Sequence, residues 1–124
     1  MRTRLYLSIL RELLLYSYVS RQGLGKLRVT VTRIPLPATA SSPDVSRPIV
    51  DAVKDVCVLY FTPVLCLQRA FVTTRLLRRA GVPARLVIGC QRLPFRSHAW
   101  VEVDGRIVVG KTDRSAFYDV LDRW

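Results

Sequence analysis

The chain has 124 residues and a formal charge of +11, from 20 Lys and Arg against 9 Asp and Glu. This length fits one domain and is too short for two with separate cores, and no fixed-period repeat indicates a solenoid or propeller. Half of the residues are apolar, which argues against disorder. The longest apolar stretch near the N-terminus is interrupted by Arg11 and Glu12 and is far shorter than the roughly 20 residues of a membrane span. We therefore expect a cytoplasmic protein without membrane insertion.

A helix, a short strand and a linker are predicted before the main domain. Apolar residues at helical spacing indicate an amphipathic helix from about residue 3 to residue 20. The run 27–32 is rich in β-branched residues and predicts a short strand. The stretch from Pro35 to Pro43 has the Pro, Ser, Thr and Ala content of a linker. These features divide the chain into an N-terminal part with a helix, a short strand and a linker, residues 1–43, and a main domain, residues 44–124.

Two helices are predicted at the start of the main domain. Ser42 followed by Pro43, and Thr62 followed by Pro63, are helix-start signals, because Ser and Thr cap helices and proline is favoured at the first helical position. They predict helices over about residues 44–60 and 63–80. Gly81 follows the second helix where a C-terminal glycine is expected.

A small antiparallel sheet is predicted to follow the helices. Strands are expected over residues 84–89, 98–103 and 106–109. The last two are joined by Asp104–Gly105, a strong hairpin signal, and a final short element is expected within residues 114–121. Helices followed by such strands predict an α+β fold with the helices packed on one face of the sheet.

The positive charge alone does not identify a nucleic-acid-binding protein. The basic residues are spread along the chain in short clusters, such as Arg75, Arg78 and Arg79, and do not form a stripe with interleaved aromatic residues. A docking surface for an acidic peptide or partner protein explains the charge at least as well. We therefore expect no nucleic-acid partner, and a basic nucleic-acid-binding module remains an alternative.

Cys66 and His98 form a candidate catalytic pair. Cys66 lies in the first turn of its predicted helix, where unpaired backbone N–H groups and the helix dipole favour a thiolate and offer an oxyanion donor. His98, the only histidine, opens the first strand of the hairpin. A cysteine on a helix N-terminus with a histidine on a facing strand is typical of papain-like enzymes. On spacing alone, however, the pair is equally compatible with a buried thiol and a hydrogen-bonded strand histidine.

The remaining cysteines and the neighbours of His98 are given structural roles. Cys57 and Cys90 lie in apolar runs and are expected to be buried free thiols. Trp100 and Glu102 alternate on the strand face of His98; Trp100 is expected to be core and Glu102 to pair with an arginine. One histidine and three scattered cysteines give no metal-ligand spacing, and no glycine-rich phosphate loop occurs. We therefore expect neither a metal nor a cofactor.

Four blocks of sequence resemble one protein family. They are CLQRA from Cys66, LLRRAGVPA from Leu76, LVIG from Leu86 and PFRSHAWVEVDG from Pro94. Over about residues 50–113 they resemble the transglutaminase-like B proteins of lasso-peptide biosynthesis. The resemblance implies a transglutaminase-like, papain-like core and a cysteine peptidase that removes the leader from the lasso precursor. It assigns Cys66 as the nucleophile that forms an acyl-enzyme and His98 as the general base.

The resemblance also implies partners. They are the leader of the lasso precursor peptide, a separate leader-recognition protein and an ATP-dependent lasso cyclase that closes the macrolactam. A separate recognition protein is expected because 124 residues leave little room for a second domain beside the catalytic core.

The third catalytic residue is where the sequence departs from the family. The family places an aspartate a dozen residues after the histidine, and Gly110 stands at that position here. A bulge in the hairpin turn would place Gly110 opposite His98. Asp113, the nearest acid downstream, is the candidate replacement unless it caps the last segment, whereas Asp104 lies roughly 20 Å from His98 by strand rise. A catalytically impaired homologue that acts as a scaffold therefore remains an alternative. An acyl transferase on the same fold is another, since an amine as well as water can attack a thioester.

Overall fold

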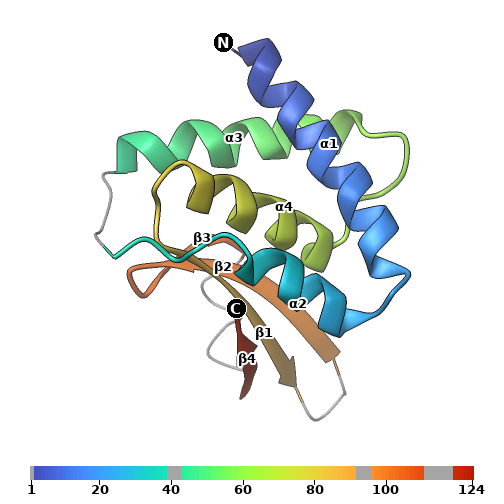
Figure 1. The fold of residues 1–124 in the computed structure, drawn as a ribbon, viewed down its shortest axis with the longest axis vertical. Helices are drawn as coiled ribbons and strands as arrows, with labels where there is room; N and C mark the ends of the chain where they lie inside the picture. The colour runs from blue at the N-terminus through green and yellow to red at the C-terminus, as the bar shows by residue number, and fades with distance from the viewer. Residues whose placement is uncertain (1, 39–42, 92–95, 111–118) are drawn as a thin grey trace.

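The computed structural model describes residues 2–38, 43–91, 96–110 and 119–124 (Figure 1). Within these residues the helices are α1 (Arg2–Ser20), α2 (Leu24–Thr32), α3 (Pro43–Leu59) and α4 (Cys66–Arg79). The strands are β1 (Ala84–Gln91), β2 (Arg96–Val103), β3 (Arg106–Val109) and β4 (Asp119–Arg123). The strands form one sheet in the order β3-β2-β1-β4, with antiparallel neighbours.

Helix α4 connects the helix layer to the sheet. It contacts the two central strands, β1 and β2, and both α1 and α3 pack against it. Its C-terminus has the geometry predicted from Gly81, which adopts φ +85° and donates its N–H to the Arg78 carbonyl. The next N–H, from Val82, bonds to the Leu77 carbonyl, which completes a Schellman motif. The predicted α+β fold with helices on one face of an antiparallel sheet is confirmed.

The β2–β3 hairpin is also confirmed. Asp104 and Gly105 have φ angles of 52° and 78°, as a two-residue type I′ turn requires. The turn itself contains no bulge. The register shifts two residues away instead, between Val101 and Glu102 on β2.

The predicted strand at 27–32 is wrong, because these residues form most of helix α2. Leu27 and Val31 are spaced by one helical turn and are both buried in the core. The Thr30 and Thr32 hydroxyls donate to the carbonyls of Lys26 and Arg28, four residues earlier. Burial against distant parts of the chain thus overrides the local β-propensity.

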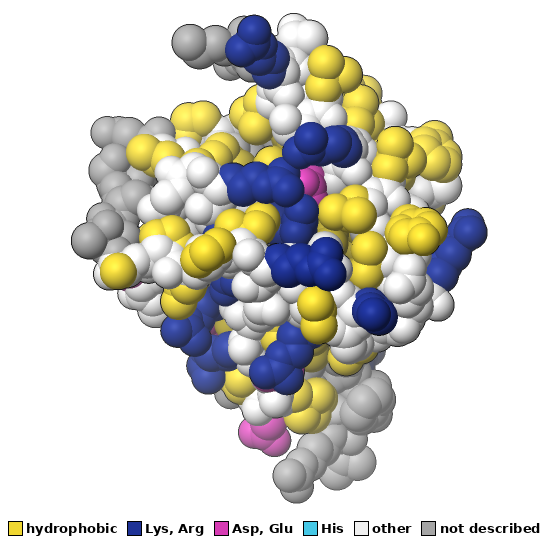
Figure 2. Space-filling view, in the orientation of Figure 1, with side chains coloured by type: hydrophobic (Ala, Val, Ile, Leu, Met, Phe, Trp, Pro, Cys, Tyr) yellow, Lys and Arg dark blue, Asp and Glu magenta, His cyan; other side chains and the backbone are white. Residues whose placement is uncertain are grey.

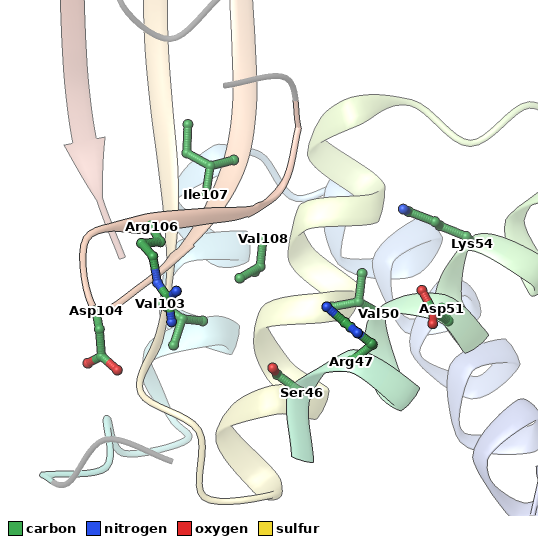
Figure 3. A pocket seen from close by; sticks show the side chains of 10 residues that line it. All are labelled: Ser46, Arg47, Val50, Asp51, Lys54, Val103, Asp104, Arg106, Ile107 and Val108. Atoms are coloured by element: carbon green, nitrogen blue, oxygen red, sulfur yellow. The ribbon is translucent and has the colours of Figure 1, made fainter. Parts of the chain in front are cut away.

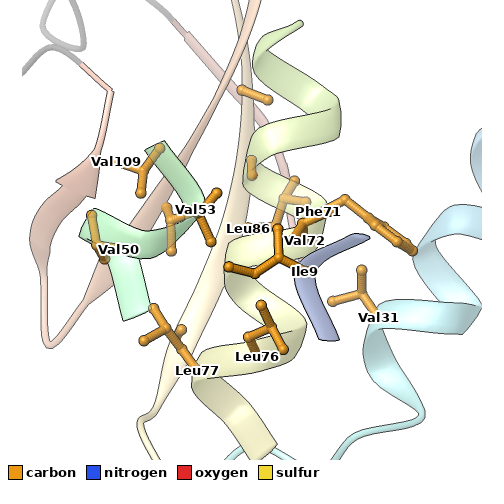
Figure 4. Close-up of a cluster of buried hydrophobic side chains, with 14 of the residues drawn as sticks. Ile9, Val31, Val50, Val53, Phe71, Val72, Leu76, Leu77, Leu86 and Val109 are labelled. Atoms are coloured by element: carbon orange, nitrogen blue, oxygen red, sulfur yellow. The ribbon is translucent and has the colours of Figure 1, made fainter. Parts of the chain in front are cut away.

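One hydrophobic core runs through the helix layer and the adjoining face of the sheet. Figure 4 shows Ile9 of α1 and Val31 of α2 beside Phe71 of α4, and Leu86 of β1 belongs to the same cluster. The N-terminal part of the chain, residues 1–43, therefore shares one core with residues 44–124, since the cluster contains residues from both.

Two arginines of α4 are buried and used within the fold. Arg78, 6% exposed, donates to four backbone carbonyls, those of Ala84, Val31, Ile34 and Trp124. Arg75 forms a 2.6 Å ion pair with Glu12, which is only 1% exposed. Two of the three cations in the sequence cluster at 75–79 therefore hold α1, α2, α4 and the sheet together and are not available to a nucleic-acid backbone.

Candidate functional site

Cys66 is the first residue of α4. The preceding residue, Leu65, is the N-cap and is extended, with φ −85° and ψ 169°, and its carbonyl accepts the first helical hydrogen bond, from the Arg69 N–H at 3.0 Å. The helix thus begins three residues after the predicted start at Pro63, which leaves the Cys66 side chain exposed at the helix end. The backbone N–H groups of the first turn have no acceptor within the helix, so this end stabilises a negative charge.

Tyr16 of α1 lies within electrostatic range of Cys66. Its ring meets Phe71 of α4 edge to face, with centroids 5.3 Å apart. Burial, and then the negative charge of Cys66, raise the pKa of Tyr16 above its ordinary value. The phenol therefore keeps its proton near the sulfur. Tyr16 is not among the residues predicted for the site, although a tyrosine on the apolar stripe of a helix can be recognised in the sequence.

The other two cysteines differ from Cys66. Cys57 and Cys90 are half-buried rather than exposed. Burial raises the pKa of the Cys57 thiol, although the charge of Arg69 and a hydrogen bond from it act in the opposite direction. Cys57 thus favours the thiol form, whereas Cys66 is the thiol open to solvent.

Cys66 and His98 lie at the same end of the molecule. Helix α4 extends roughly 20 Å from Cys66 to Arg79 at its helical rise, and after the Gly81 turn β1 returns about 17 Å from Ala84 to Gly89. Gly89 pairs with His98, and Figure 1 shows the starts of α4 and β2 on the same side of the molecule. The predicted nucleophile in the helix layer and the predicted base in the sheet therefore lie at the same end of the molecule.

The side chain of His98 lies on the face of the sheet that points away from the helices. Ala99 and Val101 of β2 pack in the core under the helices, so strand alternation turns His98 and Trp100 to the other face of the sheet. There the His98 ring stacks against the Trp100 ring, with centroids 6.0 Å apart and an interplanar angle of 28°. The structure thus brings Cys66 and His98 to one end of the fold. The two side chains are not in contact with the same residues, because Cys66 lies on α4 and His98 stacks on Trp100 on the other face of the sheet.

Trp100 is fixed by Glu102. Trp100 is 2% exposed, and its Nε1 donates to Glu102 Oε2 at 2.8 Å. The other carboxylate oxygen of Glu102 lies 3.9 Å from Arg123 Nε on β4. The expected burial of Trp100 and the expected arginine partner of Glu102 are both confirmed. These contacts form a chain from β4 to the ring that supports His98.

Gly110 lies beside this group in a conformation that favours glycine. Its φ is +112°, and a Cβ added there would lie 2.9 Å from Trp100 Cβ and 3.7 Å from His98 Nε2. The β2–β3 ladder ends with Val101 opposite Val109, so Gly110 follows next to Trp100 and not directly opposite His98. The position at which the resemblance places a carboxylate therefore points toward the imidazole but has no space for a side chain. Asp113 lies outside the described residues.

We expect Glu102→Ala to make the position of the His98 ring less well defined, because Glu102 fixes the Trp100 ring on which His98 stacks. Loss of the acceptor leaves the buried Trp100 N–H without this partner, which costs about 1–3 kcal/mol of unfolding free energy. Because His98 is the only histidine, its ring C2 proton gives one histidine signal in a proton NMR spectrum, and we expect that signal to shift and broaden. Glu102→Gln, which keeps an acceptor oxygen, and Asp104→Asn on the hairpin turn are the controls. An unchanged His98 signal in Glu102→Ala would contradict this role of Glu102.

The residues that the structure describes show no sign of a metal site or a membrane-spanning helix. They contain no group of three or more His, Cys, Asp or Glu side chains that could hold a metal ion. They also contain no helix that is both long and apolar enough to cross a membrane.

Comparison with known proteins gives one family and one relative. The family model of the transglutaminase-like superfamily matches residues 10–122. The microcin J25-processing protein McjB of Escherichia coli is 42% identical over 43 residues, which are 35% of this chain and 21% of McjB. The match thus spans about a fifth of the length of this relative. No solved structure gives a significant match.

Proposed function

The chain belongs to the transglutaminase-like superfamily, and from this premise we propose that it is a cysteine peptidase that removes the leader from a lasso-peptide precursor. The observation that supports the proposal is an exposed Cys66 on the first turn of α4, on the same side of the molecule as the start of β2, the strand that carries the only histidine of the chain. The local similarity to a microcin J25-processing protein supports this substrate class.

The proposed reaction proceeds through a thioester. The Cys66 sulfur attacks the carbonyl carbon of the last leader residue, and His98 carries the thiol proton to the leaving amine of the core peptide. Water then attacks the thioester, releases the leader with a free carboxylate and returns the proton to the sulfur. Proton transfer requires the sulfur and the imidazole to come within hydrogen-bond distance. Because the His98 ring lies on the sheet face away from the helices, this step requires the start of α4 or of β2 to move when substrate binds.

Two kinds of donor are proposed to stabilise the oxyanion formed during the attack. The backbone N–H of Cys66 is at the first turn of α4, where it has no helical acceptor. Tyr16, whose ring packs edge to face against Phe71 of α4, is the candidate second donor. Asp113 remains the candidate for orienting His98, together with the stacked Trp100 ring.

The partners we propose are those that such a step requires. The lasso precursor is the substrate, a separate leader-recognition protein delivers it, and an ATP-dependent cyclase receives the freed core peptide. The reaction needs neither a metal nor a cofactor, because thiolate, imidazole and water supply all of its chemistry.

The proposal is tested by mass spectrometry of a lasso precursor incubated with this protein and a leader-recognition protein. We expect two products, a leader with a free carboxylate and a core peptide with a free amine. Acid quenching should trap a covalent adduct of leader mass on Cys66, and prior alkylation with iodoacetamide should block both products. An intact precursor, or cleavage that survives alkylation of Cys66, would overturn the proposal.

Gly110 favours a second candidate function. Because the position of the family carboxylate has no side chain, the protein could bind the precursor complex without cleaving it and act as a scaffold. In the same experiment a scaffold would co-elute with the recognition protein and leave the precursor intact.

A further inference from the structure

A groove outside the catalytic region lies between α1 and α2. It has a volume of about 460 Å³ and is closed on one side by two arginines of α4. Four cations line it, Lys26, Arg33, Arg75 and Arg79, and no Asp or Glu is among its lining residues.

The charges of the groove are only partly neutralised. Glu12 lies behind it and pairs with Arg75 and Arg79, at 2.6 and 2.7 Å. Lys26 on α2 and Arg33 at its C-cap are both exposed, and they form no ion pair within the part of the chain that the structure describes. The groove therefore presents at least two positive charges that no described carboxylate compensates.

Apolar side chains separate these charges. Val29 of α2 is 47% exposed and Tyr18 of α1 is 67% exposed, and Leu15 forms part of the same wall. Figure 2 shows this face of the molecule, where Lys and Arg side chains alternate with apolar ones. Exposed apolar side chains between cations are typical of surfaces that bind amphipathic polypeptides, since apolar burial provides affinity and charge provides orientation.

A second groove shows that this pattern is not general on the protein. It lies between α3 and the β2–β3 hairpin (Figure 3). Its cations Arg47, Lys54 and Arg106 are accompanied by the acids Asp51 and Asp104, so its charge is mixed. The charged residues that line the groove between α1 and α2 are all cations.

We propose that the groove between α1 and α2 is a docking site for an acidic polypeptide segment that alternates carboxylates with apolar side chains. Its carboxylates pair with Lys26 and Arg33, and its apolar side chains cover Val29 and Tyr18. The proposal does not depend on the peptidase activity, because none of these residues is assigned to catalysis.

The probe is a fluorescein-labelled synthetic peptide of alternating Glu and Phe residues, measured by fluorescence anisotropy. We expect Lys26→Glu combined with Arg33→Glu to weaken binding about tenfold or more, since two attractive charge pairs become repulsive. The matched control reverses Lys54 and Arg106 and changes the net charge equally, and it should alter the affinity less than twofold. Val29→Ser should weaken binding without any change in charge. Circular dichroism confirms that each variant is folded.

Three results would overturn the proposal. They are equal losses of affinity in the two double variants, unchanged binding by Lys26→Glu with Arg33→Glu, and tighter binding of a single-stranded RNA oligonucleotide than of the peptide. The variant Cys66→Ala should bind the probe as the unmodified chain does. Failure of the peptidase proposal is thus distinguished from failure of this one.

Discussion

Replacing Cys66 with alanine is expected to abolish cleavage of the precursor. The substitution removes the sulfur that forms the thioester, and loss of a catalytic nucleophile lowers the rate by roughly 10⁴-fold or more. Because Cys66 is exposed at the start of α4, its replacement removes little packing, and we expect stability to change by less than about 0.5 kcal/mol. The measurement is the initial rate of leader release, followed by mass spectrometry.

The other two cysteines provide matched controls. Cys57→Ala and Cys90→Ala each remove one half-buried thiol and should leave the rate of leader release within a few-fold of the unmodified chain. Burial, which raises the pKa of the Cys57 thiol, also limits its access to a substrate. If Cys66→Ala retains cleavage, or if Cys57→Ala is the inactive variant, the assignment of the nucleophile is wrong.

Replacing Arg78 with methionine is expected to produce the largest loss of stability. Methionine approximates the length of the arginine stem but donates no hydrogen bond, so four backbone carbonyls lose their guanidinium partner. A buried polar group without a partner costs about 1–3 kcal/mol, and partial rehydration of these carbonyls reduces the sum. We therefore expect a loss of about 3–5 kcal/mol, which is a large part of the 5–15 kcal/mol typical of a domain.

Urea denaturation followed by circular dichroism measures this loss. Arg85→Met is the control, because Arg85 is an exposed arginine on the neighbouring strand β1, and it should change the unfolding free energy by less than about 0.5 kcal/mol. Arg78→Lys should fall between the two, since one ammonium group cannot reproduce the fork of the guanidinium. A loss below about 1 kcal/mol in Arg78→Met would show that the carbonyls find other partners.

Features of the fold that depend on local chemistry were predictable from the sequence. Gly81 ends α4 because its φ is positive, and Asp104–Gly105 forms the hairpin turn for the same reason. The α2 helix was not predictable, because its β-branched residues favour a strand until Leu27 and Val31 are buried in the core. The start of α4 at Cys66, and not at Pro63, likewise depends on the packed structure.

Some features of the candidate site were also predictable from the sequence, and others depend on how the elements pack. A cysteine in the first helical turn and the shared strand face of His98 and Trp100 follow from spacing alone. The approach of Tyr16 to Cys66 was not visible, because it depends on how α1 packs against α4. The approach of Gly110 to Trp100 depends on the register shift between β2 and β3, which has no signature in the sequence.

The backbone at the end of β3 has a consequence for protein engineering. An aspartate introduced at Gly110 by point substitution would meet both an unfavourable φ and the Trp100 side chain. A carboxylate can therefore be built next to the imidazole only by grafting a segment whose backbone runs differently after Val109. A library that varies the length of this connection should be more productive than saturation mutagenesis of the single codon.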